Sequence, residues 1–243
     1  GMSSTDFSGS FGAFFNPNLA LAPGSHLFEV DGAEIYLFAP LTGSGDLVKA
    51  GGGILDLIND SSGYTGGVTI GGGTIYVESD NALGTGLVTL DGGALVNNTE
   101  NPLTLGNAFL LGSDPVFGNG AFIEGEIHLT GPITAEGSSV TLHALSDHPL
   151  FLDGDISGAT AFTFTTADSL SQRGTIILGG SNSYTGGTVA EEATVIFANA
   201  AAIPASWLLA ATGDGYICSE LTTNLQLAFL DRFDKSHTHG IVG

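Results

Sequence analysis

Two pairs of carboxylates have a spacing that could support hydrolytic chemistry. Asp153 and Asp155 are two residues apart, and so are Glu124 and Glu126. On an extended strand, residues i and i+2 lie on the same face. A glycoside hydrolase needs two carboxyl groups about 5–9.5 Å apart across a sugar, so either pair is a candidate. The sequence Asp-Gly-Asp is more simply a turn, and we favour that interpretation for Asp153 and Asp155.

Histidines near the C-terminus could supply metal ligands. His237 and His239 lie beside Asp231 and Asp234, which are residue types that bind metals. The pattern is short and terminal and includes no cysteine, so we predict a flexible polar tail there. His148, next to a proline, fits a turn.

The remaining reactive side chains suggest packing rather than catalysis. Tyr64 and Tyr184 each begin a Tyr-Thr-Gly-Gly sequence, and we expect both to pack at a corner of the fold, with stacking on a sugar as the alternative. Cys218 is expected to be a buried small residue. Neither a Gly-x-Ser-x-Gly nor a phosphate-loop sequence occurs. We therefore predict no catalytic, cofactor-binding or metal-binding residues, and no cofactor.

The charge balance excludes several classes of partner. The 243 residues include 25 acidic and only four basic side chains, giving a net charge of −21. Nucleic-acid binding needs a basic surface, and an anionic membrane would repel this chain. Acidic polysaccharides are recognised by Arg and Lys clusters, which are missing here. Neutral sugars, proteins and cations remain open as partners, and so does stabilisation by calcium.

The composition predicts a folded chain of many short strands. Hydrophobic residues make up 42% of the sequence, which is too apolar for disorder. The 38 glycines and frequent Thr, Val and Ile favour short strands joined by tight turns. A single cysteine excludes an internal disulfide. No stretch is long and apolar enough for a membrane span, and residues 1–15 show no signal peptide, so we expect any export signal to lie outside this sequence.

One internal repeat organises the chain. A kernel of apolar strand, small polar turn, Tyr-Thr-Gly-Gly and second β-branched strand occurs at 54–70 and again at 176–189. A further matching piece precedes each kernel, at 40–47 and at 153–162. Because two matched pieces occur in the same order at both places, we interpret them as a true repeat.

Alternation of apolar and polar residues predicts the strands. In 121–129, Ile127 and Leu129 fall on one side, while Glu124, Glu126 and His128 fall on the other. A similar alternation in 138–145 places His143 on the outer side with its polar neighbours. His128 and His143 are therefore expected to face solvent rather than to form a ligand pair.

A different periodicity appears only at the C-terminal end. Residues 219–233 place apolar side chains on one helical face, and we expect this helix to cap an open sheet edge. We predict three segments: an N-terminal cap or irregular segment at 1–23, a β-helix at 24–218, and a C-terminal helical cap with a polar tail at 219–243. The two repeats within the β-helix span about 43–95 and 153–197.

These features favour a solenoid over a sandwich. At least a dozen short strands separated by glycine turns exceed what a sandwich needs, and each unit is too small to bury its apolar face alone. Stacked coils of about 20–25 residues would give roughly ten coils. The predicted class is all-β, a right-handed single-stranded parallel β-helix (β-solenoid) with a short C-terminal helical cap.

The segment 43–95 resembles the autotransporter-associated β-strand repeat, also called the passenger-associated transport repeat. The resemblance rests on Leu-x-Lys-x-Gly-x-Gly at 47–53, Tyr-Thr-Gly-Gly at 64–67 and Leu-Gly-x-Gly at 83–86. The second copy matches well at 174–188 and then diverges. The resemblance implies a right-handed parallel β-helix from the exported passenger of a bacterial surface protein, located outside the cell or on its surface. It supplies no catalytic residues to carry over.

We therefore expect a non-catalytic structural or adhesive module, not an enzyme. The partners would be host or environmental glycans or proteins, with no nucleic acid, no membrane insertion by this segment, and a monomeric state. The alternative is a β-helix that binds or cleaves a neutral polysaccharide. The motifs typical of β-helical polygalacturonases are absent, and four scattered basic residues offer little to a pectate lyase mechanism.

Overall fold

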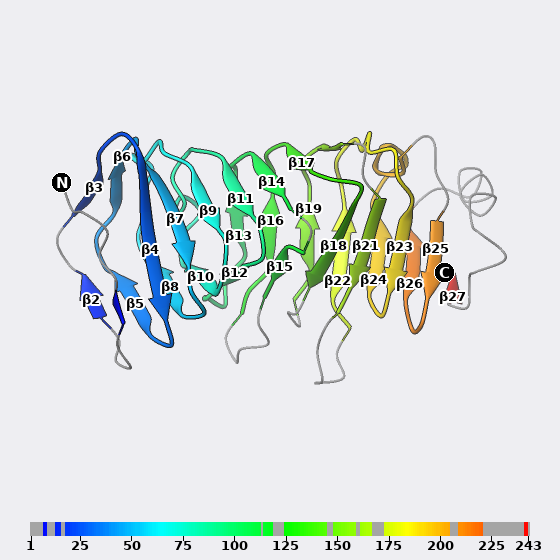
Figure 1. The fold of residues 1–243 in the computed structure, drawn as a ribbon. Coiled ribbons are helices and arrows are strands. Elements are labelled where there is room, and N and C mark those ends of the chain that lie inside the picture. Colours follow the sequence, from blue (N-terminus) through cyan, green and yellow to red (C-terminus); the bar gives the residue numbers. More distant parts are fainter. Residues whose placement is uncertain are drawn as a thin grey trace.

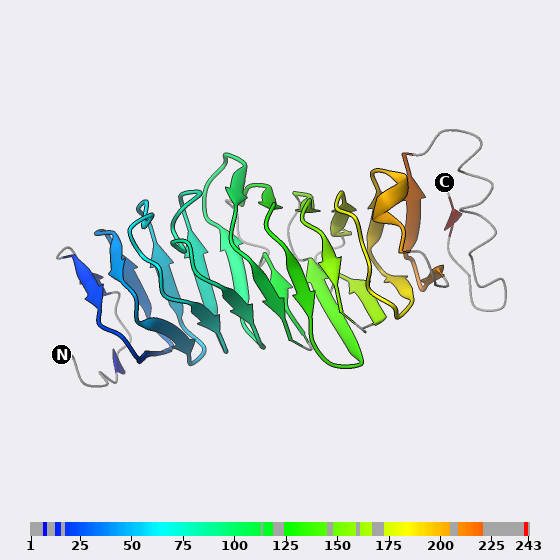
Figure 2. The ribbon, with the colours of Figure 1, turned by 90° about the horizontal axis from the view of Figure 1, so that it is seen from above.

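The computed structural model is a parallel β-solenoid of about eight turns that winds along one axis from the N-terminus to the C-terminus (Figures 1 and 2). It describes residues 7–8, 13–15, 18–112, 114–118, 124–144, 148–158, 161–166, 173–204, 209–220 and 241–242. Every strand pair in it is parallel, as expected when each coil places its strands directly on those of the coil before (Figure 1).

Three sheets form the sides of the solenoid. The ten-stranded sheet contains β2 (Ala13–Phe15), β5 (Glu34–Leu37), β8 (Ile54–Leu57), β10 (Thr74–Val77), β12 (Ala94–Asn97), β15 (Val116–Phe117), β18 (Ser139–Ala144), β21 (Ala161–Thr165), β23 (Thr188–Glu191) and β25 (Leu209–Thr212). The eight-stranded sheet contains β1 (Phe7–Ser8), β4 (Ser25–Asp31), β7 (Asp46–Ala50), β9 (Val68–Ile70), β11 (Val88–Leu90), β14 (Phe109–Leu111), β17 (Ile133–Ala135) and β20 (Ile156–Ser157). The seven-stranded sheet contains β13 (Leu103–Leu105), β16 (Ile127–Leu129), β19 (Leu150–Leu152), β22 (Thr175–Leu178), β24 (Thr194–Phe197), β26 (Tyr216–Ser219) and β27 (Ile241–Val242). In the first coils β3 (Leu19–Leu21) pairs with β6 (Leu41–Gly43).

The register shows that the first coils share one length. Along the ten-stranded sheet Tyr36 pairs with Asp56, Asp56 with Tyr76, and Tyr76 with Val96, so each coil takes 20 residues there. Later coils are longer, because Val140 pairs with Phe162 and Phe162 with Thr188. The predicted coil length of about 20–25 residues is close to the observed values, whereas the structure has about eight turns rather than ten.

The core lies inside the three sheets and follows the predicted alternation. The short strands show buried residues on either side of a partly exposed one, as in Val68–Ile70 and Ile127–Leu129. Aromatic rings fill the wider coils, where Phe162 and Phe164 stack with their centroids 5.4 Å apart. Each buried aliphatic or aromatic side chain contributes about 1.5–3 kcal/mol, so the stacked coils stabilise one another without a disulfide.

The ends of the chain differ from the predicted segments. Within residues 1–23, β1, β2 and β3 pair with β4, β5 and β6, so the solenoid begins before residue 24. At the other end, β26 ends at Ser219, and β27 pairs with it through Ile241 and Tyr216, so the sheet continues beyond residue 218. The predicted helix lies almost entirely at 221–233, outside the described residues. Among the residues that the structure describes, only Ala200–Ala202 are helical, as one 3-10 turn.

The Tyr-Thr-Gly-Gly sequence forms an interior corner in the first repeat. The Tyr64 side chain is fully buried, and its hydroxyl lies 2.8 Å from the carbonyl oxygens of Gly45 and Gly67 and accepts from the amide of Leu47 at 3.1 Å. A side chain at Gly66 would place Cβ only 2.1 Å from the Gly45 carbonyl oxygen. The motif therefore combines a tyrosine that joins two coils with glycines that let them approach.

Lys49, the basic residue of the repeat motif, is buried in the solenoid rather than exposed. Its ammonium group donates to the carbonyl oxygens of Ala50, Gly51 and Gly72 at 2.8, 2.9 and 3.1 Å. Burial lowers the pKa of Lys49 to about 8. These three hydrogen bonds satisfy the ammonium and join one coil to the next, so this lysine is not available to partners.

Acidic side chains at the turns also join successive coils. The carboxylate of Asp46 accepts from the Gly67 amide at 2.8 Å, and that of Asp80 accepts from the Thr104 amide at 2.8 Å. Asp155 accepts from the Ser181 amide at 2.7 Å. Each carboxylate therefore satisfies a backbone donor of the following coil, which gives part of the strong negative charge a structural role.

Candidate functional site

The carboxylate pair Asp153 and Asp155 is placed at an exposed turn, as the Asp-Gly-Asp sequence predicts. Both side chains already have partners. Asp153 Oδ2 lies 2.9 Å from His128 Nδ1, and Asp155 Oδ1 accepts a hydrogen bond from the Ser181 amide of the next coil. The His128 ring stacks on Phe151 with its centroid 4.0 Å away. Both aspartates therefore form contacts between neighbouring coils.

The second pair, Glu124 and Glu126, is not arranged as predicted. The alternation placed both on the outer side of a strand, but β16 begins only at Ile127, and Glu124 is 7% exposed. The chain at 124–126 is non-regular, so the period-2 rule does not apply there. Glu126 Oε2 instead lies 3.6 Å from His128 Nε2.

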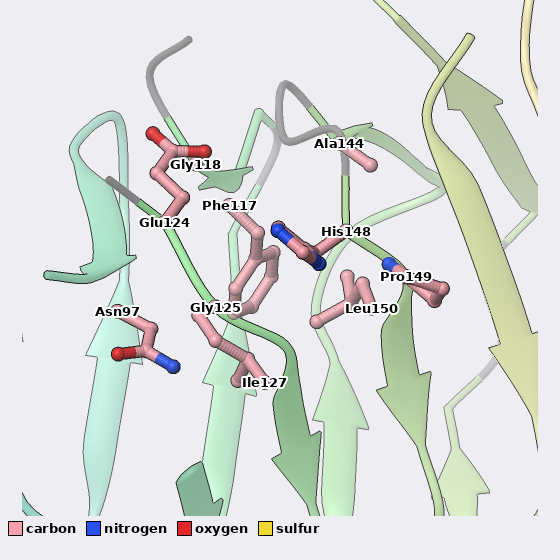
Figure 3. Close-up of a pocket in the computed structure, with 10 residues that line it drawn as sticks. All are labelled: Asn97, Phe117, Gly118, Glu124, Gly125, Ile127, Ala144, His148, Pro149 and Leu150. Atoms are coloured by element: carbon pink, nitrogen blue, oxygen red, sulfur yellow. The ribbon is translucent and has the colours of Figure 1, made fainter. Parts of the chain in front are cut away.

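Glu124 lines a small pocket, shown in Figure 3. Phe117 stands between Glu124 and His148 in this view, and the pocket volume of about 10 Å³ is room for about one water molecule. Such a volume cannot hold a sugar. The pocket is lined by Asn97, Phe117, Gly118, Glu124, Gly125, Ile127, Ala144, His148, Pro149 and Leu150.

The histidines do not converge. His128 and His143 are partly exposed, as predicted, and they lie on different sheets, in β16 and β18. Within the described ranges, no group of three His, Cys, Asp or Glu side chains could hold a metal ion. The tail with His237 and His239 lies outside the described residues.

The two repeat tyrosines are buried at coil corners, as predicted. Tyr64 is 0% exposed and Tyr184 is 1% exposed, so neither ring has a face for stacking on a sugar. The Tyr184 hydroxyl lies 2.7 Å from Thr188 Oγ1, and its ring meets Phe162 edge-on. Cys218 is half-buried on the outer side of β26, which makes it more exposed than expected.

A different cluster stands out on the outer side of the ten-stranded sheet. We call it the aromatic–acidic face, and it consists of Glu34, Tyr36, Phe38, Asp56, Tyr76 and Glu78. Strands β5, β8 and β10 position Glu34, Tyr36, Asp56 and Tyr76, because these residues alternate with inward ones and the strands pair in register. Phe38 and Glu78 follow directly after β5 and β10. Neighbouring coils therefore bring three aromatic rings and three carboxyl groups together on the outer side of one sheet.

Asp56 is the central residue of this face. It pairs in register with Tyr36 on one strand and with Tyr76 on the other, and only 1% of its surface is exposed. Its Oδ1 atom has no hydrogen-bond partner. Burial, together with the negative charges of Glu78 and Glu34, raises the pKa of Asp56 to about 7. A carboxyl group of this kind holds a proton to near-neutral pH.

The aromatic side chains complete the face. The Tyr36 hydroxyl donates to Glu34 Oε2 at 2.5 Å, and this hydrogen bond, with burial, raises the pKa of Tyr36 to about 12. Phe38 is 43% exposed, and its ring lies 6.1 Å from that of Tyr36 with an interplanar angle of 19°. The face therefore presents nearly parallel rings beside hydrogen-bonding carboxyl groups, an arrangement that suits a ligand with both apolar and hydroxyl surfaces.

The sequence contains a signal for this face at a period shorter than the 120 residues that separate Tyr64 from Tyr184. Neighbouring coils of the first repeat follow one another every 20 residues along the ten-stranded sheet. At that period, EIYLF (34–38), ILDLI (54–58) and TIYVE (74–78) align, and the tyrosines and the central aspartate fall in one row.

The comparisons with known proteins identify the repeat. A family model described as the passenger-associated-transport-repeat matches residues 47–77 and 173–196. These segments contain Lys49, Tyr64 and Tyr184, the residues that the structure buries between coils. No curated protein and no solved structure matches the chain.

Proposed function

We propose that this chain, which carries two passenger-associated transport repeats on a parallel β-solenoid, is a non-catalytic structural and adhesive module of an exported bacterial surface protein. The repeat itself carries this proposal, because it matches at two places and its motif residues build the corners of the coils. The repeat implies an exported, surface-associated protein.

The physical properties of the fold support a mechanical role. Each coil pairs only with its neighbours, so coils can be added one after another as a chain leaves the cell. The chain cannot form an internal disulfide, because it has a single cysteine. The negative charge opposes edge-to-edge association of such rods. Among the described residues, no helix is long and apolar enough to cross a membrane.

The proposed partners are host or environmental glycans or proteins, bound by a monomeric solenoid. A charge of −21 would repel nucleic acids and acidic polymers, which leaves neutral or basic surfaces as targets. The candidate carboxylate pair Asp153 and Asp155 does not argue for catalysis, because each of the two side chains forms a contact between coils.

Adhesion can be measured directly with coated beads. Beads carrying the chain should be retained on a layer of desialylated glycoprotein, whose glycans are neutral, at least about fivefold more than uncoated beads, because an adhesive module binds surfaces at many points at once. Beads coated with an unrelated protein of similar negative charge serve as the control. Equal retention of the two coated beads would contradict the adhesive role.

A second candidate function is the binding or cleavage of a neutral polysaccharide. The aromatic–acidic face is the observation that favours it, since it combines exposed ring surface with carboxyl groups. Binding without cleavage is the version that agrees with the proposed non-catalytic role, and release of new reducing ends from a polysaccharide would distinguish cleavage from it.

A further inference from the structure

We propose that the aromatic–acidic face is the adhesive contact of this module and that its ligand is a neutral glycan. This inference rests on the proposed adhesive function and specifies its site. The pairing of β5, β8 and β10 fixes four residues of this face across three coils, and Phe38 and Glu78 follow directly after β5 and β10.

The aromatic rings supply the stacking surface. Phe38 is one of the large hydrophobic side chains that remain well exposed, at 43%, and Tyr36 lies nearly parallel to it. The apolar face of a sugar ring can cover such a surface and remove it from water. Tyr76, one coil beyond Asp56, extends the aromatic row across the sheet.

The polar groups on this face match the hydroxyl groups of a sugar. Glu34 accepts a hydrogen bond from the Tyr36 hydroxyl, and Glu78 accepts one from the side-chain amide of Asn98 at 3.0 Å. These bonds orient both carboxylates, which have further lone pairs that can accept from a ligand. Asp56 Oδ1 is buried and lacks a donor. A sugar hydroxyl could supply that donor once a neighbouring tyrosine side chain turns aside, a motion of half-buried side chains.

The charge of the site favours a neutral ligand over an ionic one. The carboxylates of Glu34 and Glu78 would repel an acidic glycan. An inorganic cation lacks a binding geometry, because no three acidic or histidine side chains among the described residues could hold a metal ion. Glu34 and Glu78 already accept hydrogen bonds from neutral neighbours, which is the role that sugar hydroxyls would share.

Affinity electrophoresis at pH 7 tests this site with three neutral polymers: mannan, soluble starch and a mixed-linkage β-glucan. At least one polymer should retard the wild-type chain. Phe38→Ala should weaken that binding by about 3- to 10-fold, because it removes the exposed ring. Leu27→Ala is the matched control, since Leu27 is 44% exposed but lies in β4 on the eight-stranded sheet. It should change the binding less than twofold.

Three results of these binding measurements would overturn the proposal. The first is that none of the polymers retards the wild-type chain, and the second is that Phe38→Ala and Leu27→Ala bind alike. The third is that the chain binds an ammonium probe such as spermine but none of the polymers, and that high salt abolishes the spermine binding. If coated beads still adhere to the glycoprotein layer after its glycans are removed, the glycan site is wrong while the adhesive function stands.

Discussion

Replacing Gly66 by Ala should lower the free energy of unfolding by about 3 kcal/mol or more. The added Cβ would lie 2.1 Å from the carbonyl oxygen of Gly45 and 2.8 Å from the hydroxyl of Tyr64. The first atom is backbone of the preceding coil, so relief requires the two coils to separate at the point where Tyr64 joins them. In thermal unfolding the midpoint should fall by about 6 °C or more for a chain of this size.

Gly52→Ala is the control for this substitution. A Cβ at Gly52 meets no atom within 4 Å, so this substitution should change the free energy of unfolding by less than about 0.5 kcal/mol. Hydrogen exchange adds a local readout, since amides of residues 43–70 should exchange faster in Gly66→Ala than in Gly52→Ala. Equal midpoints for the two variants would show that the corner is not as close as the structure places it.

Replacing Asp56 by Asn should remove a large pH dependence of stability. The pKa of Asp56 is raised from its ordinary value of 3.8 to about 7, so the folded chain holds this proton more tightly than the unfolded chain. The stabilisation is therefore present at about pH 4 and is lost as the pH rises to about 7. We expect this loss to amount to about 2–4 kcal/mol, since each pKa unit corresponds to about 1.4 kcal/mol.

The groups around Asp56 explain the sign of this effect. On β5 it faces Glu34 and Tyr36, and on the other side it faces Tyr76 of β10 and Glu78, which follows β10. Among these described neighbours no basic group compensates an ionised carboxylate. Asn carries no charge at any pH. Urea unfolding should therefore show Asp56→Asn to be more stable than the wild type at pH 8, with a difference that shrinks towards pH 4.

Asp60→Asn provides the opposite case. Asp60 is exposed, and hydrogen bonds from Asn81 and Ser62 hold the pKa of its carboxyl group below the ordinary value. It contributes stability that is lost as the pH falls, so Asp60→Asn should not become more stable than the wild type at pH 8. Parallel pH profiles for the wild type and Asp56→Asn would contradict the burial of an ionisable carboxyl group at this site.

The strands and their inward residues could be predicted from the sequence. Alternation around His128 and His143 placed these side chains on the outer side correctly, because both lie in strands where the side-chain period is two. The same rule failed for Glu124, which precedes the strand and is buried. A period argument holds only within the strand, and strand boundaries are the less certain part of such predictions.

The buried charged groups could not be predicted in the same way. Lys49 was recognised as a motif residue, but its burial depends on three backbone carbonyl groups from two coils, whose positions no single stretch of sequence specifies. Asp56 likewise reads as an outward residue of β8 and is covered only because tyrosines fall on both sides of it. Recognising that row requires the exact coil length, because one extra residue in the coil would shift the register so that Tyr76 no longer pairs with Asp56.

The location of the chain is the most direct test of the proposed function. Antibodies raised against the chain should label intact cells of the organism that produces it, and protease added outside those cells should remove the label. A cytoplasmic protein should be labelled only after lysis and serves as the internal control. We predict labelling of intact cells at a level close to that of lysed cells. Labelling that appears only after lysis would contradict the proposal that this solenoid is a module of an exported surface protein.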